Sequence, residues 1–255
     1  MLVAVCEQKL VRTAALLPVG TTPRKIDHSP GEVMHALAAG RYQSPLRYPG
    51  AKSGLSKVIG ELITAAQQST RVRRVELLVE PFAGGASTAL RLVGAGTVER
   101  ALLADADPMV AAFWQVAASR TQELVDRISD EHAKYVAVGG ATALARWDRW
   151  RAWTAAPGTS RATEELELAT KCMFLNRTTF SGILHEQAGP IGGRSQTSEY
   201  SIGCRFNLER LIERRRRDVF EFFGFVSLDV SFLDSGAEGR PGVAEHVLPA
   251  SPRRP

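Results

Sequence analysis

The hydrophobic positions of the chain follow two different periods between residues 74 and 128. A short run with a continuous apolar centre, RVELLVE at 74–80, is typical of a strand buried on both faces of a parallel sheet. Two glycines follow, and apolar residues then recur at helical spacing from about 87 to 93. A second apolar run at 101–104 ends in acidic residues, and helical spacing returns at 109–128. Strand, glycine loop, helix, strand and acid predict the opening of a nucleotide-binding α/β fold.

The pattern is different on both sides of this stretch. Residues 1–40 are rich in turn-forming residues and show no lasting period, whereas 55–63 show helical spacing. Between 120 and 217 we expect helices at 143–153, at 163–176 and from 208, with a long glycine- and serine-rich loop before the last one. We therefore predict a partly disordered N-terminal extension at 1–40, an α/β domain formed by 41–119 and 218–234, a mostly helical insertion at 120–217 and an irregular tail at 235–255.

Charge adds one indication to this picture. The chain of 255 residues has a formal net charge of +5, and clustered Lys and Arg attract phosphates through counterion release. The charge therefore favours a polyanionic partner.

Hydropathy and cysteine spacing exclude some classes of protein. No run of about 18 apolar residues is present. Glu7, Lys9 and Arg12 interrupt the apolar N-terminus, which does not have the order of a signal peptide. We expect a cytoplasmic protein without a membrane segment. The cysteines lack metal-ligand spacing, so we expect buried free thiols and no metal site; they are Cys6, Cys172 and Cys204.

The glycine loop, EPFAGGAST at 80–88, is the first candidate for chemistry. Glycines let the backbone approach a ligand closely, and a loop between a strand and a helix lies at the ligand edge of a parallel sheet. The alternative is a tight turn without a ligand. The spacing is not that of a dinucleotide fingerprint, and PGAKSG at 49–54 lacks the glycine that a P-loop places before its lysine, which argues against a small kinase.

Two acids end the second strand, about twenty residues after the glycine loop. An acid at this place can accept hydrogen bonds from the hydroxyls of a ribose. The alternative is a helix N-cap, which Asp107 suits because Pro108 follows it. We expect Asp105 to bind a ligand and Asp107 to cap the helix.

Four motifs occur in an order that indicates a family: RYPGAK at 47–52, EPFAGGAS at 80–87, LLADADP at 102–108 and FLNRTTFSGILH at 174–185. Together they resemble the Dam-type DNA adenine N6-methyltransferases, over roughly residues 41–234. The resemblance implies a Rossmann-like α/β sheet that binds S-adenosylmethionine, with a mostly helical insertion for target recognition. It also implies site-specific methylation of adenine N6 in double-stranded DNA. We expect a monomer.

The resemblance assigns cofactor-binding residues. Tyr48 and Lys52 match a cofactor-pocket motif in which Ala51 replaces a second glycine. An aromatic face at Tyr48 suits a sulfonium cation or a purine, and the ammonium of Lys52 can meet a carboxylate. Asp105 matches the acid for the ribose. The loop under the methionine part is matched by Phe82, Gly84 and Gly85.

The resemblance also indicates DNA-binding residues. Asn176 and Arg177 would hold loops or phosphates near the flipped base, and the alternative is an internally bonded turn. Arg214 opens a run of four arginines that either contacts phosphate or forms a solvated helix end.

A stripe of tryptophans recurs every three residues with arginines beside it. Such a stripe either stacks on bases while cations such as Arg149 contact phosphates, or forms helix core. We expect helix core for the tryptophans. The residues are Trp147, Trp150 and Trp153, with Arg146, Arg149 and Arg151.

One part of the family pattern is missing. The family holds the adenine amino group with an Asp-Pro-Pro-Tyr tetrad, and no two adjacent prolines occur in this chain. We therefore assign no catalytic residue, and two alternatives stay open: a truncated methyltransferase, whether active or inactive, or a remnant that binds DNA or cofactor without catalysis. One hypothesis is that the tail is out of frame, because reading 245–252 one nucleotide later permits a sequence close to the tetrad and its strand.

Overall fold

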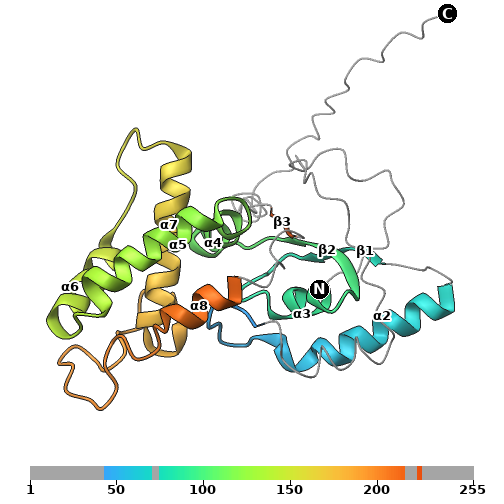
Figure 1. The fold of residues 1–255 in the computed structure, drawn as a ribbon, viewed down its shortest axis with the longest axis horizontal. Helices are drawn as coiled ribbons and strands as arrows, with labels where there is room; N and C mark the ends of the chain where they lie inside the picture. Colours follow the sequence, from blue (N-terminus) through green and yellow to red (C-terminus); the bar gives the residue numbers. More distant parts are fainter. Residues whose placement is uncertain (1–42, 71–74, 216–222, 226–255) are drawn as a thin grey trace, which may run out of the picture.

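Figure 1 shows the computed structural model of the chain, which describes residues 43–70, 75–215 and 223–225. A small sheet with two neighbouring helices forms one side of the molecule, and a group of helices forms the other. The predicted extension and tail lie outside the described residues. So does most of 218–234.

The sheet confirms the predicted α/β class. Its strands are β1 (Val75–Glu80), β2 (Val98–Leu103) and β3 (Phe223–Phe225), in the order β1-β2-β3, and all pairs are parallel. β2 begins earlier than its apolar run indicates, because pairing with β1 extends the ladder back to Val98 opposite Val75. Parallel pairing requires a crossover between β1 and β2, and α3 (Ser87–Gly94) supplies it.

Two further helical elements precede the sheet. A short turn, η1 (Lys52–Leu55), leads into α2 (Ser56–Thr70), which lies alongside α3. Helical spacing correctly predicts α2. Its buried side consists of Ser56, Gly60 and Ile63, while the apolar side chains of Leu55, Val58 and Leu62 are exposed.

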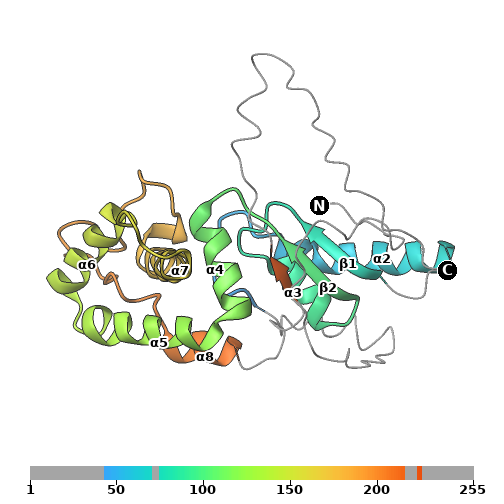
Figure 2. The ribbon, with the colours of Figure 1, turned by 90° about the horizontal axis from the view of Figure 1, so that it is seen from above.

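The second group consists of helices. α4 (Pro108–Ser119) lies between the sheet and the other helices, as Figure 2 shows. α7 packs against α4, α5 and α6. The bounds of the remaining elements are α5 (Thr121–Glu131), η2 (His132–Val136), α6 (Gly140–Ala152), α7 (Arg161–Thr178), η3 (Phe180–Gly182) and α8 (Leu208–Arg215).

The prediction of one continuous helix over 109–128 is wrong, because the helix breaks at Arg120. The backbone there has φ −135° and ψ 41°, outside the helical region. The guanidinium of Arg120 donates hydrogen bonds to the carboxylate of Glu123 at 3.0 and 2.6 Å and to the carbonyl of Ala162 at 2.7 Å. These contacts turn α5 toward α7, and apolar spacing alone does not reveal such a turn.

One hydrophobic core joins the two groups of elements. Leu78 of β1, Trp114 of α4 and Phe174 of α7 belong to the same buried cluster. Cys172 is also buried there, and burial, followed by the charges of Asp107 and Asp105, raises the pKa of its thiol. The expectation of a buried thiol is confirmed at Cys172 and wrong at Cys204, which is exposed, and Cys6 lies outside the described residues.

Candidate functional site

The glycine loop leaves the carboxyl end of β1 and is fastened to the end of β2. The amide of Ala83 donates to the carbonyl of Ala104 at 2.9 Å, and the amide of Ala104 donates to the carbonyl of Glu80 at 3.0 Å. From α4, the indole of Trp114 donates to the carbonyl of Gly84 at 2.8 Å. The loop is therefore held from two elements at the edge of the sheet where ligands bind in open α/β folds.

The side chain of Asp105 holds this loop through hydrogen bonds. Its carboxylate is buried; Oδ2 accepts a hydrogen bond from the amide of Gly84 at 2.7 Å, and Oδ1 accepts one from the amide of Asp107 at 3.0 Å. The structure thus gives Asp105 a loop-holding role. Its role toward a ribose stays a prediction. The expected N-cap is confirmed, because Asp107 Oδ1 accepts from the amide of Met109 at 2.8 Å and Pro108 begins α4.

The side chain of Tyr48 lies directly on the two glycines. A Cβ atom added to Gly84 would lie 2.8 Å from the ring atoms Cδ1 and Cε1 of Tyr48, and one added to Gly85 would lie 3.1 Å from the Tyr48 Cβ. Sequence reasoning interpreted these glycines as room for a ligand, but their immediate neighbour is this side chain. A glycine pair before a helix carries no signal that identifies such a neighbour.

The environment of the Tyr48 hydroxyl is negative. Partial burial raises the pKa of this phenol, and the nearby charges of Asp105 and Asp107 raise it further. Burial also raises the pKa of Asp107, more than its hydrogen bonds to the amides of Met109 and Val110 lower it. A cationic ligand would be favoured here over an anionic one.

Two other predicted cofactor residues have different surroundings. Phe82 lies in the same loop with its side chain 71% exposed, whereas Tyr48 is 38% exposed. Lys52 begins η1, close in sequence to Tyr48, and its side chain lies outside the described residues. The structure therefore brings together Tyr48, Gly84, Gly85 and Asp105, with Phe82 at the rim.

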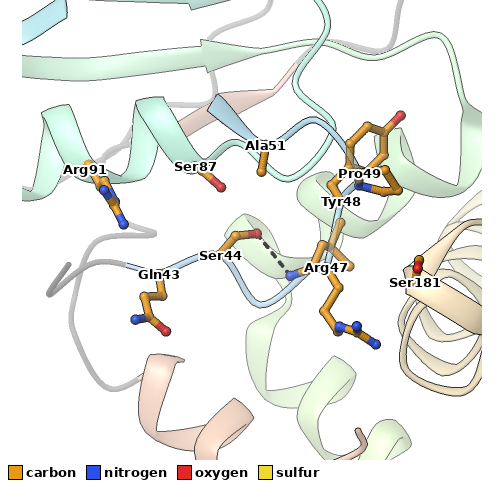
Figure 3. A pocket seen from close by; sticks show the side chains of 10 residues that line it. Gln43, Ser44, Arg47, Tyr48, Pro49, Ala51, Ser87, Arg91 and Ser181 are labelled. Carbon is orange, nitrogen blue, oxygen red and sulfur yellow. Dashed lines mark hydrogen bonds between the residues drawn. The ribbon is translucent and has the colours of Figure 1, made fainter. Parts of the chain in front are cut away.

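A pocket of about 550 Å³ adjoins Tyr48 (Figure 3). The phenol hydroxyl of Tyr48 points away from Ser44, Ser87 and Arg91, which surround this cavity. Sequence reasoning missed Ser87 and Arg91, although their position one helical turn apart, directly after the glycine loop, could have identified them. The lining residues are Gln43, Ser44, Leu46, Arg47, Tyr48, Pro49, Ala51, Ser87, Arg91 and Ser181.

Asn176 and Arg177 lie in the last turn of α7 and face the interior. Asn176 is fully buried, and its amide group exchanges two hydrogen bonds with the backbone of Arg47. Arg177 is 7% exposed and donates to the carbonyl of Pro45. Asn176 and Arg177 therefore hold the loop at 45–47, as the first of the two predictions has it, whereas the hydrogen bond from Asn176 to the carbonyl of Gly182 at 2.9 Å is that of the internally bonded turn. Direct DNA contact by either residue stays a prediction that the geometry does not support.

The tryptophan stripe on α6 forms helix core, as expected. Trp147 and Trp150 are buried, and their indoles donate to Thr179 Oγ1 at 3.0 Å and to Glu131 at 2.9 Å. Trp153 packs against the core from its edge.

The three arginines beside the stripe have different roles. Arg146 pairs with Glu131, and Arg151 donates to the carbonyls of Leu184, His185 and Ala188. Arg149 is exposed and makes no ion pair within the part of the chain that the structure describes. It is therefore the cation of this stripe that is available to a phosphate. The side chain of Arg214 lies outside the described residues.

Comparison with known proteins identifies the family of these elements. The model of the D12 class N6 adenine-specific DNA methyltransferases matches residues 48–189, which is more than half of the chain. The match begins at Tyr48 and includes the glycine loop, Asp105 and the α6 and α7 helices. No curated protein matches the chain.

The described part of the chain lacks two features. No described helix has the length and apolar character needed to cross a bilayer. Within the same residues, no group of three or more His, Cys, Asp or Glu side chains could hold a metal ion.

Proposed function

The chain belongs to the D12 class N6 adenine-specific DNA methyltransferases, and we propose that it binds S-adenosylmethionine and double-stranded DNA and methylates the N6 amino group of an adenine at a specific site. The observation that carries the proposal is the assembly of Tyr48, Gly84, Gly85 and Asp105 at the carboxyl ends of β1 and β2. This is the edge at which open α/β sheets bind ligands.

The residues at this edge suit the cofactor. S-adenosylmethionine supplies an electrophilic methyl group on a sulfonium cation. The partly exposed rings of Tyr48 and Phe82 offer aromatic faces to a cation, and Asp105 and Asp107 make the region negative. Asp105 holds Gly84, and Trp114 holds the same residue from α4, so the loop is rigid before a ligand arrives.

We assign the neighbouring pocket to the flipped adenine. An enzyme that acts on a base must take it out of the duplex into a pocket. The pocket's volume of about 550 Å³ lies within the range of small-molecule sites, and hydroxyl, amide and guanidinium groups are among those that line it. It lies against Ser181 of η3, at the end of α7, and Tyr48 lines both this pocket and the cofactor site, whereas Phe82 and Asp105 are not among its lining residues.

The helical insertion is the proposed DNA-binding part. Its arginines at positions 146 and 151 are used inside the protein, so the proposal rests on exposed cations such as Arg149. Phosphate contacts of this kind position a protein on the duplex without reading sequence.

A second candidate function is binding of both ligands without methyl transfer. The observation that favours it is the lack of any Asp-Pro-Pro-Tyr sequence among the 255 residues. The amino lone pair of adenine is delocalised into the ring, so an enzyme must accept hydrogen bonds from the N6 protons to make it a nucleophile. Methyl transfer therefore separates the two candidates.

The test measures transfer of a labelled methyl group from S-adenosylmethionine to unmethylated duplex DNA, together with the affinity for S-adenosylhomocysteine. We expect transfer by the wild type. Asp105→Asn should weaken S-adenosylhomocysteine binding about tenfold or more, because losing a hydrogen bond to a charged group costs about 1.5–3 kcal/mol.

The control is Asp126→Asn, which removes an exposed carboxylate on α5 and should change neither quantity. Binding of both ligands without transfer would favour the second candidate. A folded wild type that binds neither ligand would contradict both.

A further inference from the structure

The segment that carries Tyr48 is anchored to α7, across 129 positions of sequence. The side-chain oxygen of Asn176 accepts from the amide of Arg47 at 2.8 Å, and its nitrogen donates to the carbonyl of Arg47 at 2.7 Å. The same nitrogen donates to the carbonyl of Gly182 at 2.9 Å. The amide group of Asn176 thus pairs with one backbone residue as a neighbouring strand would.

η3 packs so closely against the backbone of Arg47 that a side chain at Gly182 would not fit. Gly182 has φ +74°, and a Cβ atom added there would lie 2.5 Å from the carbonyl oxygen of Arg47. Arg177, the next residue of α7, donates to the carbonyl of Pro45. The end of α7 therefore holds the backbone at Pro45 and Arg47, immediately before Tyr48.

Further contacts extend from the Asn176–Arg47 anchor toward the sheet and toward the helices. Toward the sheet, the ring of Tyr48 lies on Gly84, which Asp105 and Trp114 hold. Toward the helices, Thr179 follows the end of α7 and accepts a hydrogen bond from Trp147 of α6 at 3.0 Å. A contiguous set of buried and part-buried contacts therefore joins α6, which bears Arg149, to the glycine loop.

We propose that Asn176 is a positioning residue that couples DNA binding by the helical insertion to cofactor binding at Tyr48. This inference rests on the proposed function, because it takes the ligands of the two parts from there. If DNA shifts the end of α7, the Arg47–Tyr48 backbone must follow, and the affinity for the cofactor changes with it. Such coupling is reciprocal, so the cofactor changes the affinity for DNA by the same factor.

The experiment measures the dissociation constant of S-adenosylhomocysteine by calorimetry on the full chain, with and without a saturating DNA duplex. This product analogue permits no methyl transfer, so the result does not depend on activity. For the wild type we expect DNA to change the dissociation constant at least fivefold. We call the dissociation constant without DNA divided by that with DNA the ratio. For Asn176→Ala we expect a ratio close to one, while each ligand still binds alone.

Two further variants separate loss of the anchor from a general loss of folded structure. Gly182→Ala disturbs the same anchor from the η3 side and should also reduce the ratio. Glu61→Gln changes an exposed side chain of α2, which lies outside the proposed DNA-binding part and within 4.0 Å of Lys57, so the ratio should match the wild type. Hydrogen exchange should show faster exchange at 44–48 in Asn176→Ala, with unchanged protection in β1.

The outcomes distinguish this proposal from the proposed function. A wild type that binds both ligands with a ratio of one would overturn the coupling and leave the proposed function intact. A ratio that persists in both Asn176→Ala and Gly182→Ala would show that coupling runs through other residues and would also overturn the assignment to Asn176. A folded wild type that binds neither ligand would overturn both proposals.

Discussion

The backbone of Gly84 meets two demands at the residue scale. It has φ +46°, in the left-handed region that favours glycine, and the ring of Tyr48 occupies the space that a side chain would need. Gly50 shares the positive φ, at +78°, but no atom lies within 4 Å of a Cβ added there. Comparing alanine substitutions at Gly84 and Gly50 therefore separates the free-energy cost of the left-handed backbone from the cost of the contact with Tyr48.

We expect Gly84→Ala to lower the free energy of unfolding by about 2–5 kcal/mol. The left-handed conformation costs roughly 1–2 kcal/mol, and overpacking against the ring adds roughly 1–3 kcal/mol. Gly50→Ala should lose only the first amount. Urea unfolding of both variants measures the difference. Adding Tyr48→Ala to Gly84→Ala should recover most of the overpacking loss, and equal losses in the two single variants would contradict the contact.

At the scale of elements, the insertion is held together by one buried carboxylate. Glu131, at the end of α5, is 2% exposed and accepts hydrogen bonds from Arg127, Arg146 and Trp150. Arg127 also pairs with Glu167 of α7 at 3.0 Å. The network therefore joins α5, α6 and α7, which no run of apolar residues predicts.

This carboxylate makes the stability of the insertion depend on pH. Burial raises the pKa of Glu131, but the hydrogen bonds and charges of Arg146, Trp150 and Arg127 together outweigh it, so the pKa lies below its ordinary value of 4.5. A lowered pKa in the folded state means that the stabilisation is fully present above the ordinary value and is lost as the pH falls through the folded value.

We expect Glu131→Gln to destabilise the protein by about 3–5 kcal/mol at pH 7, because it takes the carboxylate away from the part-buried Arg146 and one of two carboxylates away from Arg127. The difference from the wild type should shrink below about pH 4.5. Urea unfolding at a series of pH values measures it. Asp130→Asn removes an exposed partner of Lys134 and should have little effect at any pH. A constant difference from pH 7 to the acid range would refute the role of the charge.

The formal net charge of +5 acts at the scale of the whole molecule. It favours association with a polyanion at any orientation, whereas individual exposed cations decide how the duplex is held. Arg149 lies on α6 in the helical group, and Lys57 lies on α2 beside the sheet, on the opposite side of the molecule in Figure 1. Removing either changes the net charge by the same amount.

We expect Arg149→Ala to weaken DNA binding for all sequences alike and to reduce the slope of log K against log salt concentration by about 1. Lys57→Ala should leave that slope unchanged, because this lysine lies outside the proposed DNA-binding part and is within 4.0 Å of Glu61. Fluorescence anisotropy at several salt concentrations measures both slopes. An equal change in the two variants would mean that net charge, and not the α6 surface, governs binding.

Local sequence by itself determined the α/β opening of the chain. Apolar runs and helical spacing correctly predict β1, α3 and β2, because a buried parallel strand and its crossover helix leave their period in consecutive residues. The N-cap at Asp107 is equally local, since the capping side chain and the capped amide of Met109 are two residues apart. The family follows from motifs that are each contiguous.

Tertiary structure alone decided the partners of these local features. It placed Tyr48 on Gly84, gave the Asp105 carboxylate to the loop amides, and bound Asn176 to Arg47. It also broke the helix at Arg120 through contacts with Glu123 and Ala162. The contacts of Tyr48, Asp105 and Asn176 depend on which groups distant in sequence share one buried space, where most polar groups find a partner. The break at Arg120 depends in part on Ala162, which is 42 positions away. Local sequence does not predict which of these groups become neighbours, because that is decided only when the chain packs.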